Sequence, residues 1–404
     1  MQRSTTPEDV LRLVLAGGRL AAEPGVQAAD LDRVVVRLIS RDPGVDSDGS
    51  AQRVVSDLLQ RLWQNGWQPA DVVHVVRRRA TQRAGRLVAA VIAGASAGVP
   101  PAWRAQLDRL EVPAGSVTDW WRAEGVAPAV GWREVLRVVG VLRSLPSIEQ
   151  LTPPASGSPA PQPPADPGAV PDERALSRIR GLLAKAESTE FAAEAEALTV
   201  KAQELMARYA IDTAVVAGRG EGAAGSTTVG ARRFHLDDPH AEAKAAVVQA
   251  VARANGVRVV LMPGVGIATL VGIAAELDLV ELLVTSLLVQ AGRALSLEAG
   301  AGGTRARSTA YRRGFFYSFA QRIEERLTDA RDQAHAEATA AYGSALVPLF
   351  ADRAAAVDRV VDELFPRLRQ RSGPVVDPAG WAAGRRAADD AELGAGRSRL
   401  PGAP

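Results

Sequence analysis

The sequence contains no cysteine, few lysines and few aromatic residues. Without cysteine, disulfide bonds, thiolate zinc sites, iron–sulfur clusters and a cysteine nucleophile are all excluded. Aromatic residues make up 4% of the chain, so Leu, Val, Ile and Ala must fill most of the core. The longest apolar run, residues 87–99, is rich in Ala and Gly and too short to cross a bilayer. We expect no membrane association and, because no apolar leader follows the first Arg, a cytoplasmic location.

Positive charge is carried almost entirely by arginine, because the only lysines are Lys185, Lys201 and Lys244. With 48 Lys and Arg against 46 Asp and Glu, the formal net charge is +2. A nearly neutral chain has no long-range attraction to a polyanion. Ala, Gly and Val are also abundant, and a GC-rich genome favours the codons of all four residue types. The arginine content is therefore explained by codon bias first and is only weak evidence for nucleic-acid binding.

The 404 residues favour two or three domains, and composition places their boundaries. In residues 151–170, LTPPASGSPAPQPPADPGAV, Pro, Ala, Ser and Gly replace every periodic apolar pattern, which is typical of an extended linker. A second stretch, 218–230, is rich in Gly. We therefore predict a helical domain over 1–150, a Pro-rich disordered linker over 151–170, a helical hairpin over 171–213, a flexible joint over 214–230, an α+β domain over 231–396 and a disordered tail over 397–404.

The N-terminal part is predicted to be a helical bundle. Thr6, Pro7 and Asp9 supply an N-cap residue, a first-turn Pro and a first-turn acid for one helix. Apolar periodicity indicates more helices, and indole rings are expected to wedge them together. The helices are expected at 29–40, 49–63, 70–95 and 131–145, and the indoles are those of Trp63, Trp67, Trp103, Trp120, Trp121 and Trp132.

The hairpin consists of two amphipathic helices. Ile179, Leu183 and Ala186 repeat at helical spacing in the first, and Leu198 and Leu205 do so in the second. Two short helices bury too little area to be stable alone. The hairpin must therefore dock on the C-terminal part or on a partner, with Leu183, Leu198 and Leu205 at the contact.

The C-terminal part reads as mixed α and β. Strands are predicted at 232–236, 257–262 and 268–273, with a turn at 263–266 between the last two. A helix over 238–255 and a long apolar helix over 273–295 complete the pattern. The fold class is mainly α: an N-terminal helical bundle, a central helical hairpin and a C-terminal α+β domain with a small antiparallel sheet.

Three segments of the hairpin carry a family resemblance: IRGLLAKAEST at 179–189, EAEAL at 194–198 and KAQELMARYAI at 201–211. Together they resemble DUF2786, a bacterial and phage family of unknown function. The region from Arg232 onward, including 280–288 and 312–315, looks like the C-terminal domain that usually accompanies it. The resemblance implies the architecture and no site residues, because that family has no established catalytic residues.

His235, Asp237 and His240 form the only cluster of His and acid residues and are the candidate metal ligands. No third His lies nearby and no HExxH pattern occurs, so a capping role is favoured, with Asp238 as N-cap residue and Pro239 at the first helical position. We therefore predict neither a metal nor another cofactor.

Other catalytic patterns are absent. The glycines at 263–266 are not followed by Lys and Ser or Thr, as a phosphate-binding loop requires, and no G-x-S-x-G elbow occurs. Acids at the start of the long helix are expected to be solvated there, because they favour the helix dipole and two of them, two residues apart, point differently. These acids are Glu276, Asp278 and Glu281.

Two basic helical faces are the candidate binding surfaces. In the first, Arg305, Arg307, Arg312 and Arg313 lie among aromatic residues, an arrangement typical of single-strand binding. The aromatic side chains of Tyr311, Phe315 and Phe319 recur every fourth residue, which favours a core stripe and leaves the arginines for an anion or an acidic partner. In the second, Arg79, Arg83 and Arg86 are expected to share one face of the helix over 70–95, and a solvated face is the favoured alternative.

These patterns favour a non-catalytic binding or adaptor protein whose basic helices bind nucleic acid or an acidic protein. The alternative is an enzyme that acts on nucleic acid or peptide through a site assembled from distant residues. Neither the partner nor the oligomeric state can be read from the sequence.

Overall fold

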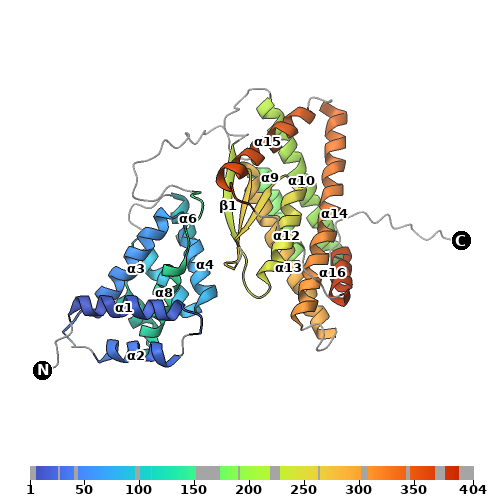
Figure 1. Ribbon diagram of the computed structural model, residues 1–404. Coiled ribbons are helices and arrows are strands. Elements are labelled where there is room, and N and C mark those ends of the chain that lie inside the picture. Colours follow the sequence, from blue (N-terminus) through green and yellow to red (C-terminus); the bar gives the residue numbers. More distant parts are fainter. Residues whose placement is uncertain are drawn as a thin grey trace. The chain divides into compact units, whose positions relative to one another are not determined.

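The computed structural model divides the chain into two compact units, Met1–Pro161 and Gln162–Pro404 (Figure 1). Apart from Leu151, the predicted linker lies outside the described residues, as does the predicted tail. The residues that the structure describes are 6–25, 28–40, 44–95, 101–110, 112–151, 173–189, 192–218, 228–262, 264–301, 308–342, 346–368 and 378–390.

The N-terminal unit is a helical bundle, as predicted. Helix α8 lies at its centre and contacts α1, α2, α3, α4 and α5 (Figure 1). The helices are α1 (Pro7–Ala22), α2 (Ala28–Ile39), α3 (Ser47–Gln64), α4 (Pro69–Arg79), α5 (Gln82–Gly94), α6 (Pro101–Arg109), α7 (Val117–Glu124) and α8 (Pro128–Ser144).

Helix α1 begins as the sequence indicates. Thr6 Oγ1 accepts a hydrogen bond from the backbone N–H of Asp9 at 3.2 Å, and Asp9 Oδ2 accepts one from the backbone N–H of Thr6 at 3.0 Å. This reciprocal capping box satisfies two of the unpaired donors at the helix start. Helix α1 then packs closely on α8. A Cβ on Gly140 would lie only 2.6 Å from the carbonyl oxygen of Gly18, so this approach requires glycine at position 140.

The prediction of a single helix over 70–95 is wrong, because the structure has two helices there. Helix α4 ends at Arg79, and Ala80 leaves the helical region at φ −120° and ψ −107°. Thr81 then caps α5 by accepting a hydrogen bond from the N–H of Ala84 at 3.0 Å. The threonine side chain favours a new helix start over continuation, so residues on either side of the break do not share one helix face.

The tryptophans pack the bundle. Trp63 lies edge-on to Trp103 with ring centroids 5.1 Å apart, and Trp121 lies edge-on to Trp132 at 5.4 Å. Trp67 is fully buried and donates from Nε1 to the carbonyl oxygen of Pro146 at 2.7 Å. The indoles therefore supply core contact area in this unit.

The C-terminal unit combines helices with a three-stranded antiparallel sheet in the order β1-β3-β2. The three predicted strands are confirmed, and Gly264 and Gly266 take positive φ angles of 78° and 69° in the turn between the last two. Its elements are α9 (Glu173–Ser188), α10 (Ala192–Gly218), β1 (Val229–His235), α12 (Ala241–Ala254), β2 (Arg258–Met262), β3 (Ile267–Ile273), α13 (Ala274–Ala301), α14 (Thr309–Tyr342), α15 (Leu346–Leu364) and α16 (Pro378–Asp390).

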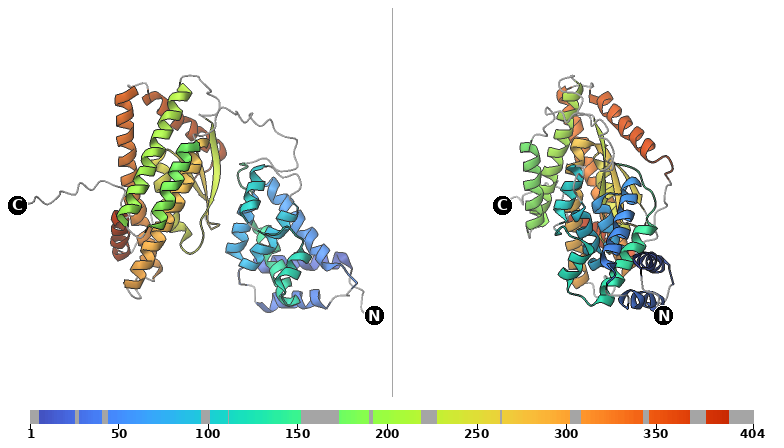
Figure 2. Two further views of the ribbon diagram at one scale, coloured as in Figure 1. Left: turned by 180° about the vertical axis from the view of Figure 1, so that it is seen from behind. Right: turned by 90° about the vertical axis from the view of Figure 1, so that its left-hand side faces the viewer.

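Helices cover both faces of the sheet, and the alternation along β3 explains how. Ala268 and Leu270 point toward the large core that includes α12 and α13. Val271 and Ile273 point the other way and pack against Val357 and other apolar residues of α15. Successive side chains of a strand point to opposite faces, so a strand buried on both faces reads as a continuous apolar run. Figure 2 shows the strands and the surrounding helices from two further directions.

The hairpin of α9 and α10 docks on the rest of the C-terminal unit. Ile179 and Leu183 are fully buried, Met206 and Tyr209 nearly so, and the two helices contact α13, α14 and α15. Two residues expected at the contact, Leu198 and Leu205, are only half-buried. Helix α10 continues to Gly218, and residues 219–227 of the predicted joint lie outside the described residues.

The predicted capping of α12 is wrong. His240 is the N-cap residue, in the left-handed region at φ 68°, and its side chain makes no capping hydrogen bond. Because that backbone conformation is incompatible with a helix, α12 begins only at Ala241, after Asp238 and Pro239. In the part of the chain that the structure describes, no helix is both long and apolar enough to span a membrane.

Candidate functional site

A small cavity with both apolar and polar walls lies against helix α10 of the hairpin, within the C-terminal unit. Its volume is about 90 Å³, and we call it the hairpin cavity. Apolar side chains, among them Met206, Leu279, Val280 and Val357, form part of its wall. The polar side chains that line it are Gln203 from α10, Asn255 from the end of α12, Glu276 from α13, Arg331 and His335 from α14, and Arg353 from α15.

A buried ion pair spans the cavity wall between α15 and α13. Arg353 donates from NH2 to Glu276 Oε1 at 2.5 Å and from NH1 to the carbonyl oxygen of Ala210 at 2.9 Å. The two charged side chains are only 10% and 14% exposed. Burial raises the pKa of Glu276, and the nearby Arg353 opposes that rise without cancelling it.

This position corrects the expectation that Glu276 is a solvated residue at a helix start. It does lie in the first turn of α13, but α15 covers that turn and supplies Arg353. Asp278 and Glu281 are more exposed, and both accept from Arg232 on β1, Glu281 at 2.9 Å. Neighbouring acids on one helix thus have different environments because different elements pack beside them.

An amide network joins the hairpin to the end of α12. Gln203 is nearly fully buried and donates from Nε2 to Asn255 Oδ1 at 3.0 Å. Asn255 in turn donates from Nδ2 to the carbonyl oxygen of Val251 at 2.9 Å. Two buried polar atoms at the cavity, Gln203 Oε1 and Arg353 Nε, have no hydrogen-bond partner among the described residues.

His335 and Arg331 line the cavity from α14. The His335 ring stacks on Phe350, with ring centroids 4.5 Å apart. Burial, together with the positive charge of Arg331, lowers the pKa of His335, so the imidazole favours its neutral form. Arg331 donates from NH1 to the carbonyl oxygen of Ala254 at 3.2 Å. The cavity therefore contains two guanidinium groups and one carboxyl group.

The hairpin is the part of the chain with a known family. Residues 174–213 match the family model described as protein of unknown function (DUF2786). The hairpin is a DUF2786 domain. No curated protein and no solved structure matches the chain. The DUF2786 segment includes the lining residues Gln203, Met206, Ala207 and Ala210, so it forms one wall of the cavity, whereas the remaining lining residues follow it in the chain.

Several aromatic side chains of the first predicted basic face are core residues. Tyr311, Phe315, Phe316 and Phe319 are buried, which confirms the core stripe and removes their rings from stacking on a partner. Tyr311 also donates from its hydroxyl to Glu298 Oε2 at 3.0 Å. The aromatic residues of α14 therefore hold this helix in the unit that contains the DUF2786 hairpin.

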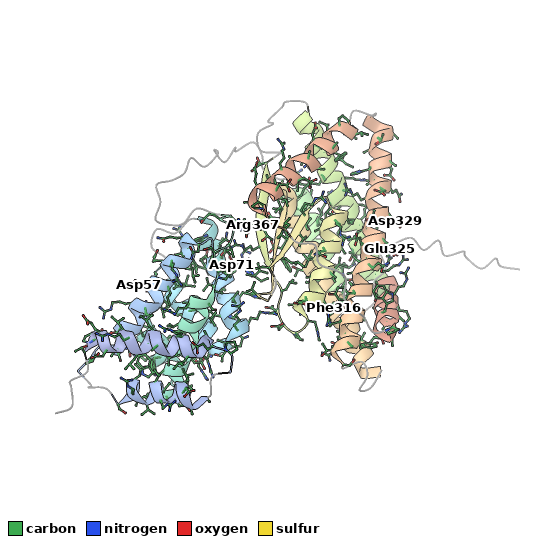
Figure 3. The ribbon with its side chains drawn as sticks, viewed as in Figure 1. Asp57, Asp71, Phe316, Glu325, Asp329 and Arg367 are labelled. Carbon is green, nitrogen blue, oxygen red and sulfur yellow. The ribbon has the colours of Figure 1, made fainter. Side chains whose placement is uncertain are left out.

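The arginines of that face have separate positions. Arg312 and Arg313 are half-buried near the start of α14, whereas Arg305 and Arg307 lie outside the described residues. Further along the helix, Arg322 donates to Glu325 at 3.0 Å. Figure 3 labels Glu325 and Asp329, one helical turn apart on α14. Arg312 and Arg313 thus place two positive charges near the start of α14.

His240, one of the candidate metal ligands, lies beside the start of α14. Burial lowers the pKa of His240, and the positive charges of Arg312, Lys244 and Arg313 lower it further. A divalent cation would meet the same repulsion. Among the described residues, no group of three His, Asp or Glu side chains is placed to hold a metal ion, so His235, Asp237 and His240 do not form such a site there.

The second predicted basic face is not the face of a single helix. Arg79 is exposed at the end of α4, whereas Arg83 and Arg86 belong to α5. Arg83 and Arg86 donate from Nε to Glu124 of α7, at 3.1 Å and 2.6 Å. The hydrogen bond from Arg86 is the largest cause of the lowered pKa of Glu124. The Glu124 carboxylate therefore neutralises part of the positive charge of Arg83 and Arg86, which the sequence alone left available to a partner.

Sequence reasoning did not bring the residues of the hairpin cavity together, and it placed Glu276 in solvent. The polar ones come from four helices and one helix end, and Ile273 of β3 adds to the apolar wall, so no local spacing connects them. Only Gln203 carried a signal, because it lies within the DUF2786 segment. Its polar side chain on the buried side of an amphipathic helix was the available indication that the segment does more than pack.

Proposed function

We propose that the protein is a non-catalytic binding protein whose C-terminal unit receives a small polar ligand in the hairpin cavity. One observation carries the proposal: Gln203 and Arg353 line the cavity, and each has a buried polar atom, Oε1 and Nε respectively, without a partner among the described residues. An unmet buried polar atom costs about 1 to 3 kcal/mol. A bound ligand that satisfies both atoms would recover that cost.

Native mass spectrometry and thermal shift test this proposal on the full chain. We expect a small compound, either retained during purification or found in a panel of small polar molecules, to raise the melting temperature. Gln203→Leu, which removes the unmet acceptor at nearly constant size, should abolish the shift. Arg359→Gln on the exposed face of α15 is the control and should keep it. Failure of every compound in the panel, with no retained mass, would reject the proposal.

Partner binding through Arg312 and Arg313 is a second part of the proposal. Their position beside His240 and Lys244 supports contact with an acidic protein or nucleic acid through charge alone. Replacing both arginines with Gln should reduce the salt dependence of binding by up to about two phosphate contacts. Arg83→Gln with Arg86→Gln is the matched control, since Glu124 already pairs with those cations. Equal binding by both double variants would eliminate this surface.

An enzyme acting on nucleic acid or peptide is the competing proposal. It has support from the same cavity, where the pKa of Glu276 is raised and that of His335 is lowered, as acid and base groups often are. A volume of about 90 Å³ favours binding of a small group over a nucleotide or peptide. Turnover of an oligonucleotide or peptide that disappears in Glu276→Gln, while circular dichroism shows the variant still folded, would favour the enzyme.

A further inference from the structure

We infer that the ligand of the hairpin cavity is a small carboxylate that also carries a hydrogen-bond donor, such as a short 2-hydroxy or 2-amino acid. This inference rests on the proposed function and names the chemistry of its ligand. It follows from the charge of the lining, from the two unmet polar atoms and from the size of the space.

The charge of the lining favours an anion. Its charged side chains are Arg331 and Arg353 against the single carboxyl of Glu276. Even when Glu276 is ionised, two cations face one anion, and protonation of Glu276 increases the imbalance. His335 adds no negative charge. A buried cation without a counter-charge is costly, so a bound carboxylate offsets the excess.

The unmet donor also calls for an oxygen acceptor. Arg353 uses NH1 for Ala210 and NH2 for Glu276, which leaves its Nε–H. Among the described residues, Arg331 donates only from Nη1, to the carbonyl oxygen of Ala254, so the other N–H groups of its guanidinium remain for a second oxygen. Guanidinium groups form their strongest hydrogen bonds with carboxylate oxygens.

The unmet acceptor calls for a donor on the same ligand. Asn255 donates from Nδ2 to Val251, so its Oδ1 must be the atom that meets Gln203. Gln203 therefore presents Nε2 to Asn255, and its Oε1 is left for a donor. A simple fatty acid provides no such donor. A hydroxyl or ammonium group beside the carboxylate does.

The size of the cavity limits the ligand to a few heavy atoms. About 90 Å³ corresponds to roughly three water molecules at about 30 Å³ each. The apolar wall of Met206, Leu279 and Val280 suits a methyl or short alkyl group. A water-filled cavity is the competing occupant, and the experiment must separate it from a bound acid.

Isothermal titration calorimetry of the full chain with four compounds of similar size tests this inference. Lactate and alanine carry both the carboxylate and the donor, propionate lacks the donor, and lactamide lacks the charge. We expect lactate or alanine to bind at least about tenfold more tightly than propionate and lactamide, since each lost interaction leaves a buried group unmet. Because this comparison uses the unmodified protein, it does not depend on how a variant folds.

Variants then assign each group. Gln203→Leu should make lactate and propionate bind alike, and Arg331→Gln should make lactate and lactamide bind alike, whereas Arg359→Gln should change neither ratio. If lactamide or propionate binds the unmodified protein as well as lactate, the inference is wrong and the proposed function stands. If none of the four compounds binds and no other small molecule does, water fills the cavity and both fail.

Discussion

Arg353 of α15 and Glu276 of α13 form a buried ion pair 2.5 Å long between helices that pack on opposite faces of the sheet. Arg353 also holds the carbonyl oxygen of Ala210 on α10. One guanidinium thus connects the DUF2786 hairpin, α13 and α15 at the cavity.

Glu276→Gln should therefore destabilise the protein by about 3 to 5 kcal/mol, because it leaves the buried Arg353 without a counter-charge. Urea unfolding followed by circular dichroism measures the loss. Asp278→Asn is the control: its partner Arg232 is 39% exposed and keeps Glu281, so the loss should be below about 1 kcal/mol. Equal losses in the two variants would show that the buried pair contributes no more than the exposed one.

Acid should destabilise the protein in part through His335. Its folded pKa lies below the ordinary value of 6.5, so below pH 6.5 the unfolded chain binds a proton that the folded chain does not. Stability from this residue is complete above pH 6.5 and is lost as the pH falls toward the folded pKa. His335→Gln should lose less free energy of unfolding between pH 7 and pH 5 than the unmodified protein. Parallel curves would contradict the burial of this imidazole.

The docking of the DUF2786 hairpin depends on Leu183. This side chain is fully buried in the core of the C-terminal unit, so Leu183→Ala should cost about 2 to 5 kcal/mol. Leu205 is only half-buried, and Leu205→Ala should cost less. The free energies of unfolding of the two variants provide the measurement. A larger loss for Leu205→Ala would mean that the hairpin packs through a different face.

Helix α16 packs against α14 through a glycine. A Cβ on Gly384 would overlap the carbonyl oxygen of Phe315 and the hydroxyl of Ser318, so Gly384→Ala should cost about 1 to 3 kcal/mol. Gly292 of α13 has open space around it, and Gly292→Ala should be neutral or stabilising by up to about 1 kcal/mol. Thermal unfolding separates the two. A melting temperature unchanged by Gly384→Ala would mean that the helices are not in close contact.

The sequence by itself determined the helical bundle, the hairpin, the three strands and the core role of Phe315 and Phe319. Each of these depends on periodicity, caps or turn residues within a short window, and such local patterns are visible without a fold. The break at Ala80 was missed because apolar residues continue on both sides of it, and only the Thr81 cap marks the new helix.

The tertiary structure alone decided the environment of the charged residues. Glu276 and Asp278 are two residues apart in one helix, yet the first is buried against Arg353 and the second is exposed beside Arg232. In the same way, Glu124 forms ion pairs with Arg83 and Arg86, and Gln203 is hydrogen-bonded to Asn255, 52 positions later in the sequence. Burial and pairing of charges depend on which elements meet in space, and those contacts between distant residues have no local sequence signal.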